Sequence, residues 1–309
     1  MRRTVLNKIY DLAKNNKRII YIGSDVGYGV MDEMKKNYPD QFIMEGISEQ
    51  HIIGMSAGMA MEGFIPYINT IATFFSRRAL EQIIIDISLH NLPVRLIANG
   101  GGLVYAPLGP THQAIDDISV LRTIPNLTIL TPCDSVEIEK LTEASVPYPS
   151  PIYFRLGKGG DEIITNENQK IDIGKAVIKK SFNKTVILSC GIMSQIALVA
   201  SSKLSKNNID CGVIHFNTIK PIDRVMLKKV FDSATKVITL EENFISGGFG
   251  SLILENYHSS RSKTRIDFLT LGIEDRFISK YGSQDQLLDH CGLSPEKVHA
   301  QILKFIKND

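Results

Sequence analysis

Two short segments of the sequence supply a carboxylate and an imidazole. The first, GISEQH at residues 46–51, contains Glu49, and the second, GPTHQ at residues 109–113, contains His112. The first segment follows an apolar run and starts a helical pattern, whereas the second is a loop rich in Gly and Pro. In an α/β sheet both positions fall where the carboxyl ends of the strands converge. This combination indicates proton transfer on a bound heterocycle.

Glu49 also has an ordinary structural interpretation. The run at 41–44 is typical of a short buried strand, and Ser48 is expected to cap a helix whose apolar positions recur at helical spacing from Ile52. Glu49 then lies in the first helical turn, where free backbone N–H groups stabilise a carboxylate. The local pattern therefore leaves a helix-start charge open, and Glu45 competes with Glu49 for any chemical role.

Strands and helices alternate along the chain, which predicts an α/β fold with two doubly wound domains and mostly parallel sheets. A helix is expected at 76–89, and a glycine-rich stretch after residue 156 marks the exit from the first unit. We predict a first domain at residues 1–158, a linker at 159–184 and a second domain at 185–309. The expected strands are 19–22, 42–44, 65–70, 94–98, 128–131 and 151–155 in the first unit, and 185–188, 211–215, 236–240 and 265–269 in the second.

The composition argues against several kinds of partner. The formal net charge is +2, and the 35 Lys and Arg are mixed with 33 Asp and Glu, which gives no basic footprint for nucleic acid or a membrane surface. No segment has the apolar length of a signal peptide or a bilayer span, so we expect a cytoplasmic protein. The four cysteines show no metal-ligand spacing, and no metal site is expected in this chain.

Further motifs occur around the two segments. In order they are Gly58, GFIP at 63–66, TF at 73–74, LRTIPN at 121–126 and TPCD at 131–134. Together with GISEQH and GPTHQ, they resemble the pyrimidine-binding domain of the transketolase family of thiamine diphosphate enzymes, which includes 1-deoxyxylulose-5-phosphate synthase. EEN at 241–243 with GGFG at 247–250 resembles the C-terminal domain of that family, and we expect this stretch only to start a helix.

The resemblance assigns roles to both segments. It implies that Glu49 hydrogen-bonds N1′ of the aminopyrimidine of thiamine diphosphate, which favours the tautomer whose 4′ nitrogen can take the proton from thiazolium C2. It implies that His112 faces the substrate and hydrogen-bonds its carbonyl or hydroxyl oxygens, with Gln113 beside it as a substrate-binding residue. A loop histidine bonded to a backbone carbonyl is the alternative for His112.

The resemblance also suggests three kinds of supporting residue. Phe74 is the predicted aromatic that stacks on the pyrimidine ring, with Phe75 as the fallback, and an ordinary core phenylalanine is the alternative. Asp25 resembles the family aspartate at the end of the first strand, or it caps the next helix. Arg155 resembles the family arginine near the distal phosphate of the substrate, or it pairs with a carboxylate across a domain boundary.

One family motif is missing from the sequence. Family enzymes hold the diphosphate through Mg²⁺ with a Gly-Asp-Gly motif and an asparagine pair, and this chain contains no Gly-Asp-Gly. The resemblance therefore implies a cofactor shared with a separate N-terminal subunit that carries the motif and holds Mg²⁺. Since the family is built from dimeric cores, an α2β2 assembly is expected.

The predicted function is the C-terminal subunit of a heteromeric transketolase that transfers a two-carbon ketol unit from a ketose to an aldehyde. Leu108 stands where typical family members place an aspartate that reads a substrate hydroxyl, and residues 99–102 read NGGG where a histidine is common. An unusual or nucleotide-linked sugar is therefore the expected substrate. The alternatives are a pyruvate-using synthase, a 2-oxoacid dehydrogenase β-type subunit, and a non-catalytic partner subunit.

Overall fold

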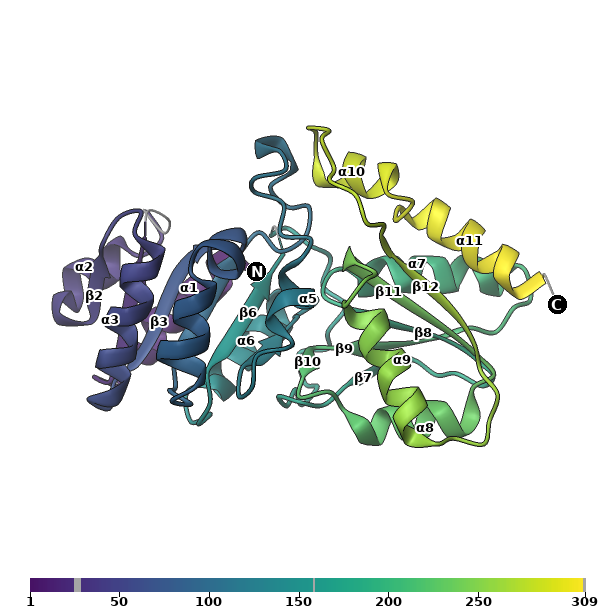
Figure 1. Cartoon of the computed structure of the whole chain (residues 1–309), viewed down its shortest axis with the longest axis horizontal. Coiled ribbons are helices and arrows are strands. Elements are labelled where there is room, and N and C mark those ends of the chain that lie inside the picture. Colours follow the sequence, from purple (N-terminus) through teal and green to yellow (C-terminus); the bar gives the residue numbers. More distant parts are fainter. Residues whose placement is uncertain (25–28, 158, 308–309) are drawn as a thin grey trace.

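Two α/β units lie side by side in the computed structural model, which describes residues 1–24, 29–157 and 159–307 (Figure 1). Each unit is built around one sheet with helices on both faces. The predicted α/β class with two mostly parallel sheets is confirmed. None of the helices in the described ranges is long and apolar enough to cross a membrane.

The first sheet has the strand order β10-β5-β6-β4-β3-β1-β2, and all its strands are parallel except β10. Because both faces are covered, β1, β4 and β6 are buried at every residue. The strands are β1 (Ile19–Gly23), β2 (Phe42–Met44), β3 (Ile65–Ile71), β4 (Arg95–Asn99), β5 (Thr128–Leu130), β6 (Ile152–Leu156) and β10 (Thr218–Lys220).

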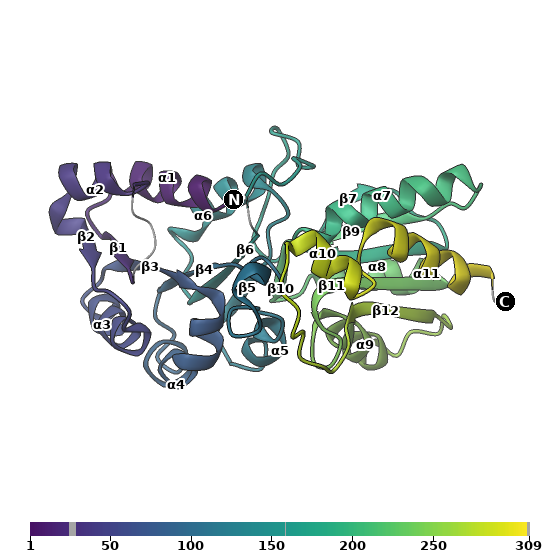
Figure 2. The same ribbon diagram turned by 90° about the horizontal axis from the view of Figure 1, so that it is seen from above.

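Helices α1, α2 and α6 cover one face of this sheet, and α3, α4 and α5 lie on the other (Figure 2). The α-helices are α1 (Arg2–Ala13), α2 (Asp32–Asn37), α3 (Glu49–Met61), α4 (Leu80–Gln82), α5 (Asp117–Leu121) and α6 (Ser135–Ser145). The shorter turns are the 3₁₀ helices η1 (Pro39–Gln41) and η4 (Ala106–Leu108) and the π-helices η2 (Phe74–Arg78) and η3 (Ile83–Ser88). The expected helix at 76–89 is thus present as a π-α-π segment.

The second sheet has the order β12-β11-β8-β9-β7, and only β7 runs antiparallel. Helices α7 and α11 pack on one face, and α8 and α9 lie on the other (Figure 1). The elements are β7 (Val177–Lys180), β8 (Thr185–Cys190), α7 (Met193–Lys206), β9 (Gly212–Phe216), α8 (Arg224–Ser233), β11 (Lys236–Phe244), α9 (Phe249–Ser260), β12 (Asp267–Ile273), α10 (Gln284–His290) and α11 (Pro295–Lys307).

Two short strands change how the units divide. β7 lies inside the range expected to be linker, yet it pairs with β9 and belongs to the second sheet. β10 follows β9 in sequence, yet it pairs with β5 and forms the edge of the first sheet. The purely linking part of 159–184 therefore ends before residue 177, and the second unit contributes one strand to the first.

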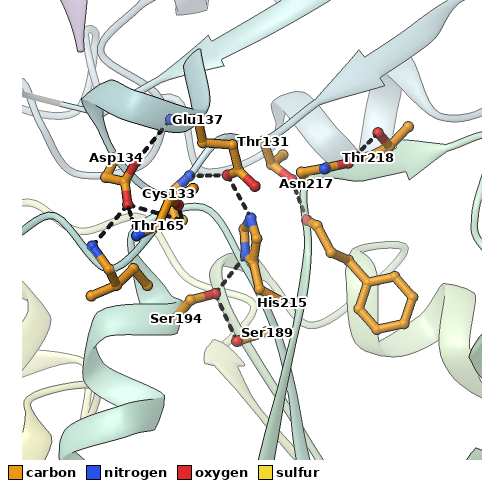
Figure 3. Close-up of polar contacts among 12 residues, drawn as sticks. Thr131, Cys133, Asp134, Glu137, Thr165, Ser189, Ser194, His215, Asn217 and Thr218 are labelled. Carbon is orange, nitrogen blue, oxygen red and sulfur yellow. Dashed lines mark hydrogen bonds and ion pairs between the residues drawn. The ribbon is translucent and has the colours of Figure 1, made fainter. Parts of the chain in front are cut away.

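Buried hydrogen bonds also join the two units (Figure 3). Nε2 of His215, in β9, lies 2.8 Å from Oε2 of Glu137 in the first turn of α6, and the Cys133 backbone N–H donates to the same oxygen at 2.8 Å. The other ring nitrogen, Nδ1, lies 2.6 Å from the Ser194 hydroxyl. Glu137 and His215 are fully buried. This contact therefore fixes α6 of the first unit against β9 of the second.

Acid is expected to weaken the fold through Glu137. Burial alone would raise the pKa of Glu137, but His215 and the Cys133 N–H hold it below the usual value of 4.5. A carboxyl with a lowered folded pKa stabilises the protein above its unfolded pKa and loses that contribution as the pH falls through the folded value. In urea denaturation, we expect the native protein to lose more stability between about pH 5 and pH 3 than the Glu137→Gln variant does.

The matched control is Glu139→Gln, since Glu139 lies on the same helix but is largely exposed, 3.7 Å from Lys8. Its acid dependence should stay close to that of the native protein. Equal slopes for the native protein and Glu137→Gln would contradict the assignment.

Candidate functional site

Glu49 is buried at the start of α3, directly after the loop that follows β2. Its side chain is 1% exposed. Oε2 accepts a hydrogen bond from Nη1 of Arg78 at 2.7 Å, and the Thr70 hydroxyl, near the end of β3, lies 3.5 Å from Oε1. The helix start is not capped as predicted, because the Ser48 side chain makes no capping hydrogen bond and its hydroxyl is buried without a partner among the described residues.

The Arg78 guanidinium lies between Glu49 and Phe74. Its Cζ atom is 4.1 Å from the centre of the Phe74 ring, while Nη1 donates to the Glu49 carboxylate. Arg78 itself is exposed at the surface. Glu49 and Phe74 together therefore hold a flat group that donates N–H bonds, with the carboxylate at its edge and the aromatic ring on its face.

The structure distinguishes Phe74 from Phe75. Phe74 is half-buried and faces Arg78 and His112, whereas Phe75 is fully buried in the core with its ring 6.4 Å from that of Tyr153. Both residues lie in the first turn of η2, where consecutive side chains point in different directions. Phe75 has no free face for a ligand, so the fallback prediction is wrong.

His112 lies on the other side of Phe74. The two ring centres are 5.4 Å apart at an interplanar angle of 70°, and Nδ1 of His112 lies 2.9 Å from the hydroxyl of its neighbour Thr111. Nε2 makes no hydrogen bond with the described residues. Glu49 and His112, 63 positions apart in sequence, are thus linked through Arg78 and Phe74 at one edge of the sheet.

Gln113 and Arg155 are placed differently from His112. The Gln113 side chain is fully buried, and neither atom of its amide has a partner among the described residues. Arg155 is 7% exposed; its Nε lies 2.8 Å from the Asp117 carboxylate, and Nη2 donates to the backbone oxygens of Ala114 and Glu242. These contacts hold Nε and Nη2 of Arg155 in place, and its role as a phosphate ligand stays a prediction.

Arg155 does contact the neighbouring unit, although not as expected. Its carboxylate partner, Asp117, belongs to the same unit, and only the Glu242 carbonyl comes from the other. Asp25 lies outside the described residues. Sequence reasoning missed Arg78, for which the only signal was an adjacent pair of arginines in an otherwise helical pattern.

One buried cluster in the described ranges combines metal-ligating side chains. Cys133, Glu137 and His215 each offer an atom within 4.8 Å of the others. Its carboxylate is already bonded to the imidazole, and the Lys179 ammonium donates to nearby Thr165. A thiol and an imidazole are also poor ligands for Mg²⁺. The cluster therefore does not supply the cation site that a diphosphate group requires.

The sequence matches two domains of known proteins. Residues 1–160 match the pyrimidine-binding domain of transketolase, and residues 174–298 match the transketolase C-terminal domain. The chain belongs to the transketolase family.

Individual relatives agree with this assignment. The chain is 30% identical to one of the subunits of the apulose-4-phosphate transketolase of Phocaeicola vulgatus, over 99% of this chain and 97% of that one. A solved structure described as a split gene transketolase, inactive beta4 tetramer, superposes with a TM-score of 0.89 at 28% identity, over 98% and 97% of the two chains. The 1-deoxy-D-xylulose-5-phosphate synthase of Pseudoalteromonas translucida is 34% identical over 96% of this chain, which spans only 47% of that enzyme.

Proposed function

We propose that this chain is the C-terminal subunit of a thiamine diphosphate-dependent transketolase, which transfers a two-carbon ketol unit from a ketose sugar to an aldehyde. The observation that carries the proposal is the geometry around Arg78. Glu49 and Phe74 hold its guanidinium by the edge and by the face. An aminopyrimidine is likewise flat, and when its ring nitrogen is protonated it presents an N–H donor at its edge, so the two residues fit that half of the cofactor.

The other half of the cofactor calls for a partner. No Gly-Asp-Gly sequence is present in the chain, and the buried cluster of Cys133, Glu137 and His215 is unsuited to Mg²⁺. Similarity to a single subunit of the apulose-4-phosphate enzyme, and to a transketolase encoded by a split gene, supports a separate N-terminal subunit that holds the diphosphate and Mg²⁺. We propose an α2β2 assembly with this partner.

Each residue of the site then has a task. Bound thiamine diphosphate would supply the carbon that adds to the ketose carbonyl. Glu49, which is buried and paired with the Arg78 guanidinium in this structure, would accept a hydrogen bond from the protonated pyrimidine ring nitrogen and share its proton. Phe74 would orient the ring. His112 has its Nδ1 occupied by Thr111, which leaves Nε2 to donate to or accept from substrate oxygens.

Reconstitution tests the proposal. The purified chain, a family subunit with Gly-Asp-Gly, thiamine diphosphate and Mg²⁺ would be mixed with ketose phosphates and aldehyde acceptors. We expect turnover only when both subunits are present. Turnover by this chain alone would refute the shared site, and tight subunit association without cofactor binding or turnover would favour a non-catalytic partner.

The substrate is decided by the same assay. Leu108 is half exposed, on the loop that carries His112, and it offers no polar group to a sugar hydroxyl. We propose a modified or nucleotide-linked sugar, although the similarity to the apulose-4-phosphate enzyme also supports a sugar phosphate. Pyruvate tests the synthase and 2-oxoacid dehydrogenase alternatives, because both would release CO₂ from it. Efficient use of xylulose 5-phosphate would exclude the unusual sugar.

The Arg78→Ala variant should bind thiamine diphosphate more tightly in the assembled enzyme. The guanidinium occupies the place between Glu49 and Phe74 and has to leave before a ring can enter, so its removal eliminates a competitor. We expect a gain of several-fold in apparent affinity by titration, on the order of 1 kcal/mol for a half-exposed ion pair.

The control is Arg77→Ala, because Arg77 is bound to Asp116 and forms no ion pair with Glu49. Its cofactor affinity should stay near that of the native enzyme. Weaker binding by Arg78→Ala alone would show that Arg78 contacts the bound cofactor and does not compete with it.

A further inference from the structure

The loop that carries His112 is closed at its base by a pair of backbone hydrogen bonds. Gly102 and Ala114 exchange N–H···O bonds at 2.9 Å in both directions. Residues 103–113 form the loop above this base, with η4 in its middle and His112 near its end. The position of His112 therefore depends on how the base is fixed.

Glu242, from β11 of the second unit, fixes that base. Its carboxylate Oε1 accepts the backbone N–H of Leu103 at 2.9 Å and the side-chain amide of Gln284 at 2.8 Å. The carboxylate also packs against Gly102, where an added Cβ would lie 2.3 Å from the Glu242 Cδ. Gly102 has a φ of +68°, which favours glycine. The Glu242 side chain is 2% exposed, so it anchors the loop from below.

Two more contacts from the second unit reach the same loop. The Phe244 N–H donates to the carbonyl of Ile115 at 2.7 Å, directly beyond the base. Near the tip, an added Cβ on Gly109 would lie 2.6 Å from the ring of Tyr281, so this ring rests on the backbone three residues before His112. The loop thus belongs to the first unit by sequence but rests on the second.

We propose that Glu242 is a positioning residue that holds the His112 loop in place for the reaction. The expected effect of Glu242 on turnover rests on the proposed function. Its expected effect on the structure of the loop is independent of that function. It also gives the EEN segment a task beyond starting a helix. Acting from the second unit, Glu242 determines where the His112 imidazole stands relative to Glu49 and Phe74.

Amide hydrogen exchange on the full chain tests whether Glu242 holds the loop in place. The Glu242→Ala variant removes the acceptor for the Leu103 N–H, and exchange across residues 103–112 should rise at least several-fold. Burial raises the pKa of Glu242 to about 7, so Gln is a close substitute that keeps an oxygen acceptor. Glu242→Gln should therefore restore near-native exchange. Unchanged exchange in Glu242→Ala would overturn the proposal.

Glu241→Ala is the matched control. Glu241 is the preceding residue and equally buried, but among the described residues its carboxylate accepts from the Phe249 and Gly250 amides at the start of α9 and not from the loop. Its loss should speed exchange at the start of α9 and leave 103–112 unchanged. Should Glu242→Ala fail to fold, Glu242→Asp keeps the carboxylate but shortens the side chain that reaches the Leu103 N–H, and it should show the same loop-specific increase. Unchanged exchange in Glu242→Asp would then overturn the proposal.

Kinetic measurements on the assembled enzyme test the effect of Glu242 on turnover. Glu242→Ala should lower kcat about tenfold to a hundredfold, as expected for a misplaced acid–base group, while the apparent affinity for thiamine diphosphate stays unchanged. Glu242→Gln should recover most of kcat. A normal kcat in Glu242→Ala would overturn the role of Glu242 in turnover. An inactive native assembly would contradict the proposed function but would not affect the exchange result.

Discussion

The Glu49→Gln variant of the assembled enzyme is expected to lose about 10²- to 10⁴-fold in kcat, the range that a positioned general acid or base contributes. A glutamine at this place keeps the shape of the side chain and an oxygen acceptor, but it cannot take up a proton. Steady-state kinetics with saturating cofactor measures the effect. Circular dichroism and thermal unfolding would establish that the fold survives, since Gln can still accept from Arg78.

Glu45→Gln separates this effect from a general loss of charge. Glu45 lies four residues earlier and is exposed, with one oxygen 3.6 Å from His51. It competed with Glu49 in the sequence but has no contact with Arg78 or Phe74 in the described structure. Full activity is expected for Glu45→Gln. Comparable losses in both variants, or native activity in Glu49→Gln, would exclude Glu49 as the proton-sharing residue.

The largest loss of stability is expected for Asp117→Ala. The Asp117 carboxylate is fully buried and accepts from Nε of Arg155 at 3.1 and 2.8 Å and from the Tyr153 hydroxyl at 2.9 Å. Burial alone would lower the pKa of Arg155, but Asp117 raises it, so the arginine stays charged. Removing one partner of such a buried pair costs about 3–5 kcal/mol, because the remaining charge is left without compensation.

Urea unfolding of Asp117→Ala and Asp116→Ala provides the measurement and its control. Asp116 is the neighbouring residue, but its ion pair with Arg77 is partly exposed, so its loss should cost less than about 1 kcal/mol. Similar costs for both variants would contradict a buried structural pair. A substrate role for Arg155 would instead appear as a raised KM in Arg155→Met with little loss of stability.

The sequence pattern predicted most of the framework because buried parallel strands leave continuous apolar runs between helical segments. The predicted strands at 19–22, 42–44 and 94–98 each coincide with an observed strand to within a residue or so. Among the described residues, two strands were missed. β7 and β10 are short, antiparallel and at sheet edges, where one neighbour suffices and the sequence need not be apolar throughout.

The site was less predictable because its details depend on tertiary contacts. Glu49 and His112 lie at the predicted edge, since a helix start and a glycine-rich loop are visible in the sequence. The choice between Phe74 and Phe75 depends on which of the two side chains turns toward the core, and two adjacent phenylalanines give no sequence signal for that. Arg155 is paired with Asp117, 38 residues away in sequence, and no local sequence pattern relates the two residues.

The pairing of β10 with β5 limits where the chain can be divided into separate fragments. A truncation after residue 176 would remove β10, so β5 would have an open edge with unpaired N–H and C=O groups. Such a fragment should aggregate by recruiting a foreign strand. A chimera that contains the first unit therefore also needs residues 218–220. The two units are best transferred together.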